Sequence, residues 1–290
     1  MANEPLLSVD LRVDFPGRPR ALSQACFDIH SGEILGLVGE SGSGKSTLAL
    51  AILRLLGNEG RASGRLLFRG RDLLAVSERE MRGIRGREIA LILQSPLSSL
   101  NPALRIGAQL AEAWRAHALE ASDELAAAMQ RALASVGLPN NHEFLDRYPS
   151  QISVGQAQRV LIAMAAMHSP ALLIADEPTS ALDVITQAEI LKLFTELNRN
   201  MGSALLYISH DLPSVAAICH RIAILREGEI VECGRRDDVL TRTVHPYTRQ
   251  LLACVPWLPH PGAPTSKRVP KLPSVVFPGS TIRRVPRAPN

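Results

Sequence analysis

Residues 39–46 carry the sequence Gly-Glu-Ser-Gly-Ser-Gly-Lys-Ser, which fits the pattern GxxxxGK[ST]. Glycines at this spacing let consecutive backbone N–H groups curl around an anion without Cβ clashes. The apolar run 33–38 predicts a buried strand before the stretch, and the helical periodicity of 45–56 predicts a helix that stops at Gly57. That helix would present its positive N-terminus to the anion, so the stretch predicts a phosphate-binding loop. A flexible Gly/Ser turn is the alternative, and it does not account for the strand-to-helix context.

A second chemical motif lies at 172–177, Leu-Leu-Ile-Ala-Asp-Glu. The apolar residues predict a buried strand over 171–175, and Asp176 emerges at its carboxyl end, where open α/β sheets bind ligands. Asp176 is placed to hold Mg²⁺ through its water shell, and Glu177 to accept a proton from an attacking water. Two adjacent carboxylates also suit a solvated turn. Together with the phosphate loop, however, they predict a nucleotide site.

The expected roles in this site follow from side-chain chemistry. Lys45 reaches the outer phosphates, and the Ser46 hydroxyl is a Mg²⁺ ligand. His210 follows a predicted strand over 204–208 and is expected to contact the γ-phosphate, although a lone histidine is also common as a structural or surface residue. Gln94 follows a predicted strand over 88–93 and offers a neutral oxygen to Mg²⁺ or water, or is simply a polar strand end. The expected nucleotide-binding residues of the loop are Gly39, Glu40, Ser41, Gly42, Ser43, Gly44, Lys45, Ser46 and Thr47.

The order of elements along the chain predicts an α/β fold with a mainly parallel sheet. Between about 97 and 167 the chain is rich in Ala, Leu and Glu at helical spacing, which predicts an inserted helical subdomain. The predicted hairpin 221–233 turns at Glu227-Gly228. Further predicted strands span 6–13, 21–29, 64–69 and 204–208, and a predicted helix spans 184–201.

Charge separates the chain into a body and a tail. The net charge is +4, from 32 basic and 28 acidic residues. Residues 256–290 hold six basic residues and no acidic one, which leaves 26 basic and 28 acidic residues in 1–255. The positive balance therefore belongs to a Pro- and Arg-rich C-terminal extension, and pI alone does not favour nucleic acid as a partner. No apolar run approaches the ~20 residues of a spanning helix, and the four scattered cysteines fit reduced cytosolic thiols.

These motifs, in this order, resemble the ATP-binding cassette (ABC) ATPases over roughly residues 6–255. The resemblance includes the phosphate loop, the glutamine loop at Gln94, the Asp-Glu-Pro-Thr-Ser-Ala-Leu-Asp run at 176–183 and the Ser-His-Asp run at 209–211. It implies a P-loop NTPase of ABC type, with a mainly parallel RecA-like sheet, an antiparallel β subdomain and the helical insertion. The implied activity is hydrolysis of ATP with Mg²⁺, and the implied ATPase domain is 1–255.

More narrowly, the chain resembles ATPase subunits of oligopeptide, dipeptide and nickel importers. The supporting residues are 94–102, 174–183 and His245-Pro246-Tyr247-Thr248 followed by Leu251-Leu252. The resemblance implies a second ABC ATPase subunit, two membrane permease subunits and an extracytoplasmic solute-binding protein as partners. It also implies a peripheral position on the cytoplasmic face of the inner membrane. Dipeptide, oligopeptide, nickel chelate and opine-like solutes all remain open.

The resemblance also assigns residues that chemistry alone does not. Phe15 would stack on adenine, or else pack into the first strand pair. The signature read across the dimer would be Ser153, Val154, Gly155 and Gln156, and Asp183 would contact the partner subunit. Val154 replaces a glycine of the family, which impairs one ATP site if that position needs a glycine conformation or close backbone approach. The dimer would then be a heterodimer with unequal sites; the other interpretation is that the position tolerates side chains.

Three other functions remain as alternatives. One is a regulatory nucleotide-binding subunit with a degenerate site, and another is an ABC protein that works without permeases. The chain shows neither the second cassette nor the long coiled-coil insertion common in the latter class. An exporter ATPase is the third, but the 245–248 motif favours import.

Overall fold

The computed structural model describes residues 4–117 and 124–255, so the expected extension at 256–290 lies outside the described part. Contacts divide the described residues into two compact units, one from residues 4–77 and 204–255 and the other from residues 78–117 and 124–203. The first unit, unit 1, contains β1 (Leu7–Phe15), β2 (Arg18–Ile29), β3 (Ile34–Val38), α1 (Lys45–Ile52), β4 (Arg61–Phe68), β5 (Arg71–Asp72), β8 (Ala204–Ser209), α9 (Leu212–Ile218), β9 (Arg221–Arg226), β10 (Glu229–Arg235), α10 (Arg236–Arg242) and α11 (Pro246–Ala253).

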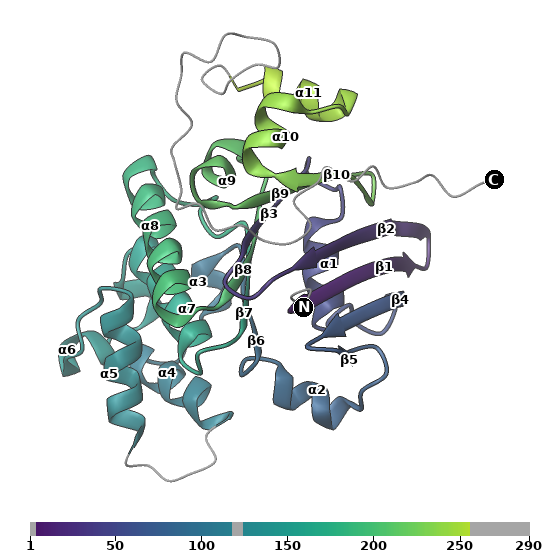
Figure 1. Ribbon diagram of the computed structural model, residues 1–290. Helices are drawn as coiled ribbons and strands as arrows, with labels where there is room; N and C mark the ends of the chain where they lie inside the picture. Colours follow the sequence, from purple (N-terminus) through teal and green to yellow (C-terminus); the bar gives the residue numbers. More distant parts are fainter. Residues whose placement is uncertain (1–3, 118–123, 256–290) are drawn as a thin grey trace. The chain divides into compact units, whose positions relative to one another are not determined.

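The strands of unit 1 follow the order β5-β4-β1-β2-β10-β9-β3-β8 (Figure 1). The pairs at the β5 end, from β4–β5 to β1–β2, are antiparallel. By contrast, β3 runs parallel to both β8 and β9. The α/β prediction with an antiparallel β part is thus confirmed.

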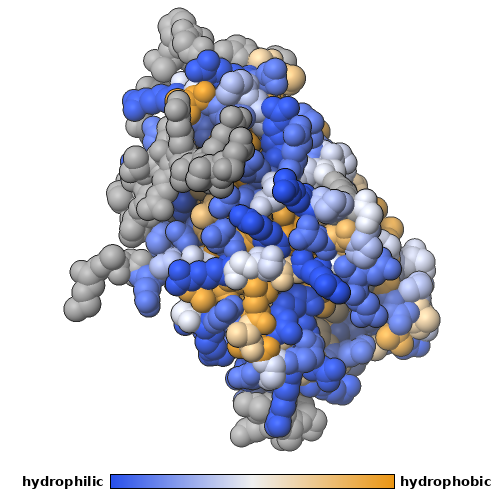
Figure 2. Space-filling model, turned by 90° about the vertical axis from the view of Figure 1, so that its right-hand side faces the viewer, coloured by the Kyte–Doolittle hydropathy of each residue, from blue (hydrophilic) through white to orange (hydrophobic). Residues whose placement is uncertain are grey.

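The burial patterns of the strands differ between the parallel and the antiparallel part of the sheet. Every residue of β3 and β8 is buried, as expected for parallel strands covered on both faces. In β1, buried residues alternate with more exposed ones, as expected when one face meets solvent. Figure 2 shows a mostly hydrophilic face on which apolar side chains form small groups.

The second unit, unit 2, contains most of the helical sequence. Its elements are α2 (Glu78–Ile84), β6 (Ile89–Ile92), α3 (Pro96–Ser99), α4 (Ile106–Arg115), α5 (Leu125–Ser135), α6 (His142–Leu145), η2 (Pro149–Gln151), α7 (Val154–Ala166), β7 (Leu172–Asp176) and α8 (Val184–Met201). Strands β6 and β7 pair in parallel. The core of its helices includes Leu110, Leu133 and Ile162, each fully buried.

Two local predictions differ from the structure. Helix α1 ends at Ile52, not at residue 56, because Arg54 adopts a left-handed φ of 53° and the Leu55 N–H bonds back to the Leu50 carbonyl at 2.8 Å. The Arg54 guanidinium donates to the carbonyl of Val76 at 2.6 Å, which holds this turn in place. The short helices α2, α9, α10 and α11 were not predicted, since each is too brief to show a helical period.

The hairpin β9–β10 forms as expected, with Glu227 and Gly228 at φ values of 50° and 79°. Within residues 4–117 and 124–255, no helix combines the length and apolar composition that crossing a bilayer requires.

Candidate nucleotide site

The loop 39–44 leaves β3 and enters α1 through left-handed backbone. Gly42 has a φ of 81° and Gly44 a φ of 109°, values that L side chains rarely adopt. A Cβ on Gly44 would lie 2.7 Å from Leu22 Cδ2, and one on Gly39 would lie 2.2 Å from the Leu225 carbonyl oxygen. Glycine is therefore required here both by conformation and by close approach.

The start of α1 has the properties of an anion site. Its N-cap residue, Gly44, has no side chain to bond the N–H groups of the first turn. Such uncapped N–H groups and the helix dipole attract phosphate. Lys45 is 7% exposed, and its Nζ donates to the carbonyls of Gly39 at 2.8 Å and Glu40 at 3.0 Å. The ammonium thus lies over its own loop, while Ser46 is exposed.

His210 lies at the same sheet edge as this loop. Strands β3 and β8 are parallel, and Val38 pairs with Ser209. Gly39 and His210 are the next residues on each strand, so both leave the sheet at one edge. The His210 side chain is exposed, and Asp211 behind it caps α9 by accepting the Ser214 N–H at 3.2 Å. Unit 1 therefore presents a phosphate loop and an imidazole together.

The corresponding edge of unit 2 carries the acidic residues. Ile92 of β6 pairs with Ala175 of β7, so Gln94 and Asp176 follow the same edge of this strand pair. Gln94 is exposed, whereas Asp176 and Glu177 are 6% and 7% exposed. Carboxylates buried at the end of a strand suit a ligand-binding or catalytic site and do not match a solvated turn.

Glu177 has a strained backbone that the sequence did not reveal. Its φ is 50°, in the left-handed region that a non-glycine residue rarely occupies. The Glu177 carbonyl accepts the Ser180 N–H at 3.3 Å and the Ser180 hydroxyl at 3.0 Å. Strain of this kind gathers at active sites, where surrounding structure maintains it. Ser180 thus supports the turn that carries Glu177.

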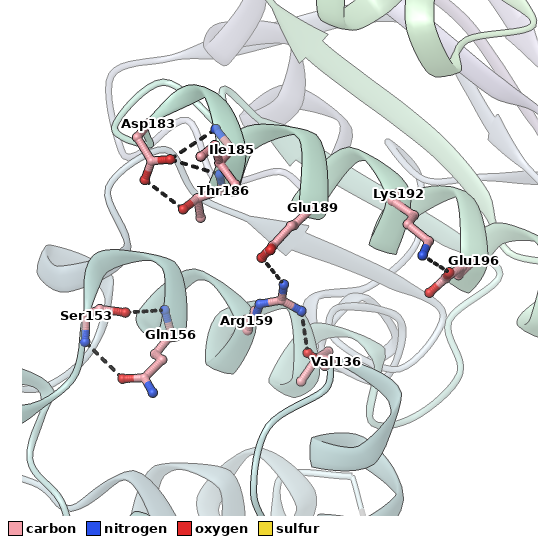
Figure 3. Close-up of polar contacts among 10 residues, drawn as sticks. All are labelled: Val136, Ser153, Gln156, Arg159, Asp183, Ile185, Thr186, Glu189, Lys192 and Glu196. Carbon is pink, nitrogen blue, oxygen red and sulfur yellow. Dashed lines mark hydrogen bonds and ion pairs between the residues drawn. The ribbon is translucent and has the colours of Figure 1, made fainter.

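The segment 153–156 begins helix α7. The Ser153 hydroxyl accepts the Gln156 N–H at 3.1 Å, and the Gln156 side chain accepts the Ser153 N–H at 3.0 Å (Figure 3). This reciprocal pair is a capping box. Val154 is the first helical residue and has no left-handed φ. The valine is therefore free of the backbone strain that a required glycine conformation would have imposed.

Asp183 caps the neighbouring helix α8. Its carboxylate accepts the N–H groups of Ile185 and Thr186, both at 3.0 Å, and the Thr186 hydroxyl at 2.7 Å (Figure 3). The bonds from Thr186, led by its hydroxyl, lower the pKa of Asp183. The methyl group of Thr186 lies where a Cβ on Gly155 would approach to 2.8 Å. The start of α7 and the start of α8 are consequently packed against each other within unit 2.

Figure 3 shows a second contact between helices α7 and α8, farther from their N-termini. The Arg159 guanidinium donates to the Val136 carbonyl at 2.7 Å and pairs with Glu189 at 2.8 Å. Arg159 therefore joins α7, the end of α5 and α8.

Phe15 ends β1 and is half-buried. A Cβ on Gly60 would lie 2.8 Å from Phe15 Cε1, so the ring already packs against this loop. The packing contact of Phe15 is thus present, and its stacking on adenine stays a prediction.

Comparison with known proteins adds independent information. The family described as ABC transporter matches residues 22–180. A probable peptide ABC transporter ATP-binding protein of Sinorhizobium fredii is 44% identical, over 92% of this chain and 80% of its own length. The dipeptide transport ATP-binding protein DppD of Bacillus subtilis is 40% identical, over 97% of this chain and 92% of its own.

Solved structures show the same fold. A dimeric, post-hydrolysis structure of the ATP-binding cassette MJ0796 bound to ADP and Pi aligns with a TM-score of 0.69 at 27% identity. The alignment covers 79% of this chain and 97% of that chain.

Proposed function

The chain belongs to the ABC transporter family as an ATP-binding, ATP-hydrolysing subunit that powers import, and we propose that its cargo is a peptide or a related small solute. The relatives named for peptide and dipeptide transport support this cargo, and they align over most of their length. A nickel chelate or an opine-like solute stays within the proposed class. The observation that carries the ATPase assignment is the left-handed glycine loop before the uncapped helix α1.

In the proposed site the phosphate loop holds ATP. The N–H groups of residues 41–47 surround the phosphates, and Lys45 moves from its loop carbonyls to the outer phosphates. Phe15 stacks on adenine. Stacking of this kind is worth about 1–3 kcal/mol, by analogy with base-stacking platforms.

The residues expected to hold Mg²⁺ fit that ion chemically. Ser46, Gln94 and Asp176 offer a hydroxyl, an amide oxygen and a carboxylate, which are the hard oxygen ligands that Mg²⁺ prefers. When bound, Mg²⁺ neutralises charge that develops on the phosphates. Asp176 is positioned for this by the buried end of β7.

Glu177 is proposed as the general base. Its carboxylate accepts a proton from the water that attacks the γ-phosphate, and the left-handed turn supported by Ser180 holds it in place. His210 donates a hydrogen bond to the γ-phosphate. Loss of the γ-phosphate then releases the contacts that ATP made, which is the switch that drives transport.

The proposed working unit contains two ATPase subunits. Ser153, Val154, Gly155 and Gln156 face the nucleotide of the partner, and Asp183 contacts that partner. Because the Val154 backbone is unstrained, any impairment comes from the bulk of its side chain. We propose a heterodimer in which this bulk makes the two sites unequal.

The proposed setting is the cytoplasmic face of the inner membrane, under two permease subunits fed by an extracytoplasmic solute-binding protein. The relatives named for peptide and dipeptide transport support this arrangement. Unit 2, which contains the helical insertion, is proposed to transmit the conformational change to the permeases near residues 94–102.

The first test is Glu177→Gln in the assembled transporter. The amide keeps the shape of the side chain but accepts no proton, so turnover should fall at least about 100-fold while ATP still binds. ATP affinity is measured by titration calorimetry, turnover by phosphate release, and cargo by ATP-dependent uptake of a labelled dipeptide or nickel chelate.

Glu196→Gln is the matched control, because Glu196 lies on the exposed side of α8 and pairs only weakly with Lys192 at 3.7 Å (Figure 3). Its turnover should equal that of the wild type. Near-normal turnover of Glu177→Gln would remove Glu177 from the mechanism. The cargo class would be refuted if the wild-type transporter took up no dipeptide, oligopeptide, nickel chelate or opine-like solute.

A further inference from the structure

Helix α11 reaches the phosphate loop from the far end of the described chain. The Glu40 N–H donates to the Tyr247 hydroxyl at 3.3 Å, across 207 positions of sequence. Tyr247 is 4% exposed, although it lies on a short helix near the end of unit 1. A buried tyrosine usually finds a partner for its hydroxyl, and here the partner is the backbone of the loop.

The start of α11 is built to fix this tyrosine. Pro246 occupies the first helical position, and the His245 side chain caps the helix by accepting the Tyr247 N–H at 3.2 Å. Proline at this position needs no N–H bond and presets the helical φ. The His-Pro-Tyr sequence therefore sets both the start of the helix and the direction of the tyrosine.

The hairpin β9–β10 holds the same ring. The Arg226 guanidinium lies 4.9 Å from the centre of the Tyr247 ring, within the range of a cation–π contact. The following turn reaches the loop at a second point, where the Gly228 N–H donates to the Ser43 carbonyl at 3.0 Å. Two backbone groups of the phosphate loop, at Glu40 and Ser43, are thus bonded to segments from residues 221–253.

These two bonds matter for an anion site. A phosphate loop acts through N–H groups that are aligned before the anion arrives, and a mobile loop must be ordered at the cost of affinity. Bonding the Ser43 carbonyl to Gly228 directs that oxygen to the hairpin, and bonding the Glu40 N–H to Tyr247 fixes the first turn of the loop. Burial raises the pKa of Tyr247, while the bond from the Glu40 N–H to its oxygen acts in the opposite direction.

We propose that Tyr247 is a positioning residue for the phosphate loop, through which docking of helix α11 sets nucleotide affinity. The proposal rests on the proposed function, because it assumes that ATP binds in this loop. Linkage requires the reverse effect as well: bound nucleotide must stabilise the docked α11 by the same factor. A tyrosine that only fills the core would show neither effect.

The test compares Tyr247→Phe with Tyr207→Phe in the full chain. Phenylalanine keeps the ring and removes the hydroxyl. Tyr207 is the matched control, because it is a buried tyrosine of the same unit whose hydroxyl bonds Ser214 at 3.2 Å. The measurements are the Kd of a fluorescent ATP analogue with Mg²⁺ and amide hydrogen exchange of residues 39–44 and 246–253.

A single net hydrogen bond changes an equilibrium constant by about two- to tenfold. Tyr247→Phe should therefore weaken the ATP analogue by about that factor and speed exchange at the Glu40 amide in the nucleotide-free protein. Nucleotide should also slow exchange in 246–253 of the wild type. The Tyr207→Phe protein should show wild-type affinity and wild-type exchange in 39–44.

Wild-type affinity and wild-type Glu40 exchange in Tyr247→Phe would overturn the proposal. If that variant does not fold, the wild type decides: nucleotide that leaves exchange in 246–253 unchanged would overturn the proposal, because linkage requires bound nucleotide to stabilise the docked α11. Lys45→Ala separates the proposed ATP site from the proposed role of Tyr247. A Lys45→Ala protein that binds ATP normally would refute the ATP site. Exchange at the Glu40 amide still reports on the bond to Tyr247, whatever that result.

Discussion

The phosphate loop of unit 1 and the segment 153–156 of unit 2 each form the start of a helix, yet they leave the first N–H groups of that helix in opposite states. The loop uses left-handed Gly42 and Gly44 and leaves the first turn of α1 without a side-chain cap. The segment 153–156 has no left-handed residue, and Ser153 and Gln156 cap α7 through the two reciprocal hydrogen bonds of a capping box.

The difference explains which positions tolerate change. An uncapped helix end keeps its N–H groups for an external anion, and its glycines are fixed by backbone geometry. A capped end already satisfies its own N–H groups, so its glycine pattern reflects close packing and not conformation. Val154 can therefore replace a glycine without strain, whereas Gly44 has no substitute.

The largest expected effect is that of Gly44→Ala. The alanine would have to adopt the φ of 109° that Gly44 has. Its Cβ would also lie 2.7 Å from Leu22 Cδ2 and 3.1 Å from the Ala21 carbonyl oxygen. Left-handed strain in a non-glycine residue costs about 1–3 kcal/mol, and movement of the loop would weaken ATP binding more than tenfold. Urea unfolding and ATP titration measure the two losses.

Gly42→Ala is the matched comparison for this loop. Gly42 shares the left-handed φ, at 81°, but its Cβ would meet no described atom within 4 Å. Its loss of stability should be about 1 kcal/mol, clearly smaller than that of Gly44→Ala. Equal losses would show that crowding by Leu22 and Ala21 plays no part.

The sequence predicted these two regions unequally well. The pattern GxxxxGK[ST] specifies the loop because its chemistry depends on local backbone, and β3, β8 and the β9–β10 hairpin were also placed correctly. The bonds that support the site were not predicted. Ser180 bonds Glu177 and Thr186 bonds Asp183 over only three positions, but each bond depends on a local turn geometry that the residue types alone do not specify. The bond from Glu40 to Tyr247 is a tertiary contact, which no spacing in the chain displays.

A signal for Tyr247 did exist. The sequence 245–248 stood out as a motif, but its physical role could not be derived, since the contact joins residues 207 positions apart. The end of α1 at Ile52 was missed for a similar reason, because the Arg54 turn is held by carbonyls from another part of unit 1.

The next effect tests packing in the capped region. Gly155→Ala would place a Cβ 2.8 Å from Thr186 Cγ2 without any left-handed strain. Overpacking of this kind costs about 1–3 kcal/mol, so the urea midpoint should fall by an amount that the second substitution Thr186→Ser largely restores. The serine removes the methyl group and keeps the hydroxyl that bonds Asp183. A double variant no more stable than Gly155→Ala would contradict the proposed contact.

A smaller effect is expected from Val154→Gly. Since the Val154 backbone is helical, glycine relieves no strain and its helix propensity is lower by only a few tenths of a kcal/mol. Stability should change by less than about 0.5 kcal/mol. ATP turnover of the proposed heterodimer should rise, because the substitution removes the bulk that is proposed to face the partner's nucleotide. Unchanged turnover would mean that the two sites are not made unequal by Val154.

The smallest effect concerns the charge on the α8 cap. The Thr186 hydroxyl is the first cause of the lowered pKa of Asp183, so Thr186→Val should raise that pKa toward its ordinary value, and Thr186→Ser should leave it low. A carboxyl whose folded pKa lies below the unfolded value stabilises the fold above the unfolded pKa, about 3.9 for Asp. That contribution is lost as pH falls through the folded pKa.

The stability gap between wild type and Thr186→Val should therefore be widest near neutral pH and narrow as the solution is acidified past that range. NMR titration of the Asp183 carboxyl carbon measures the pKa, and urea midpoints at each pH measure the gap. No comparable dependence is expected for Gly44→Ala, because the loop glycines act through uncharged backbone. A gap that stays constant with pH would show that the Thr186 hydroxyl stabilises the α8 cap equally whether the Asp183 carboxyl is ionised or protonated. The capped region would then be as independent of charge as the loop's glycine geometry.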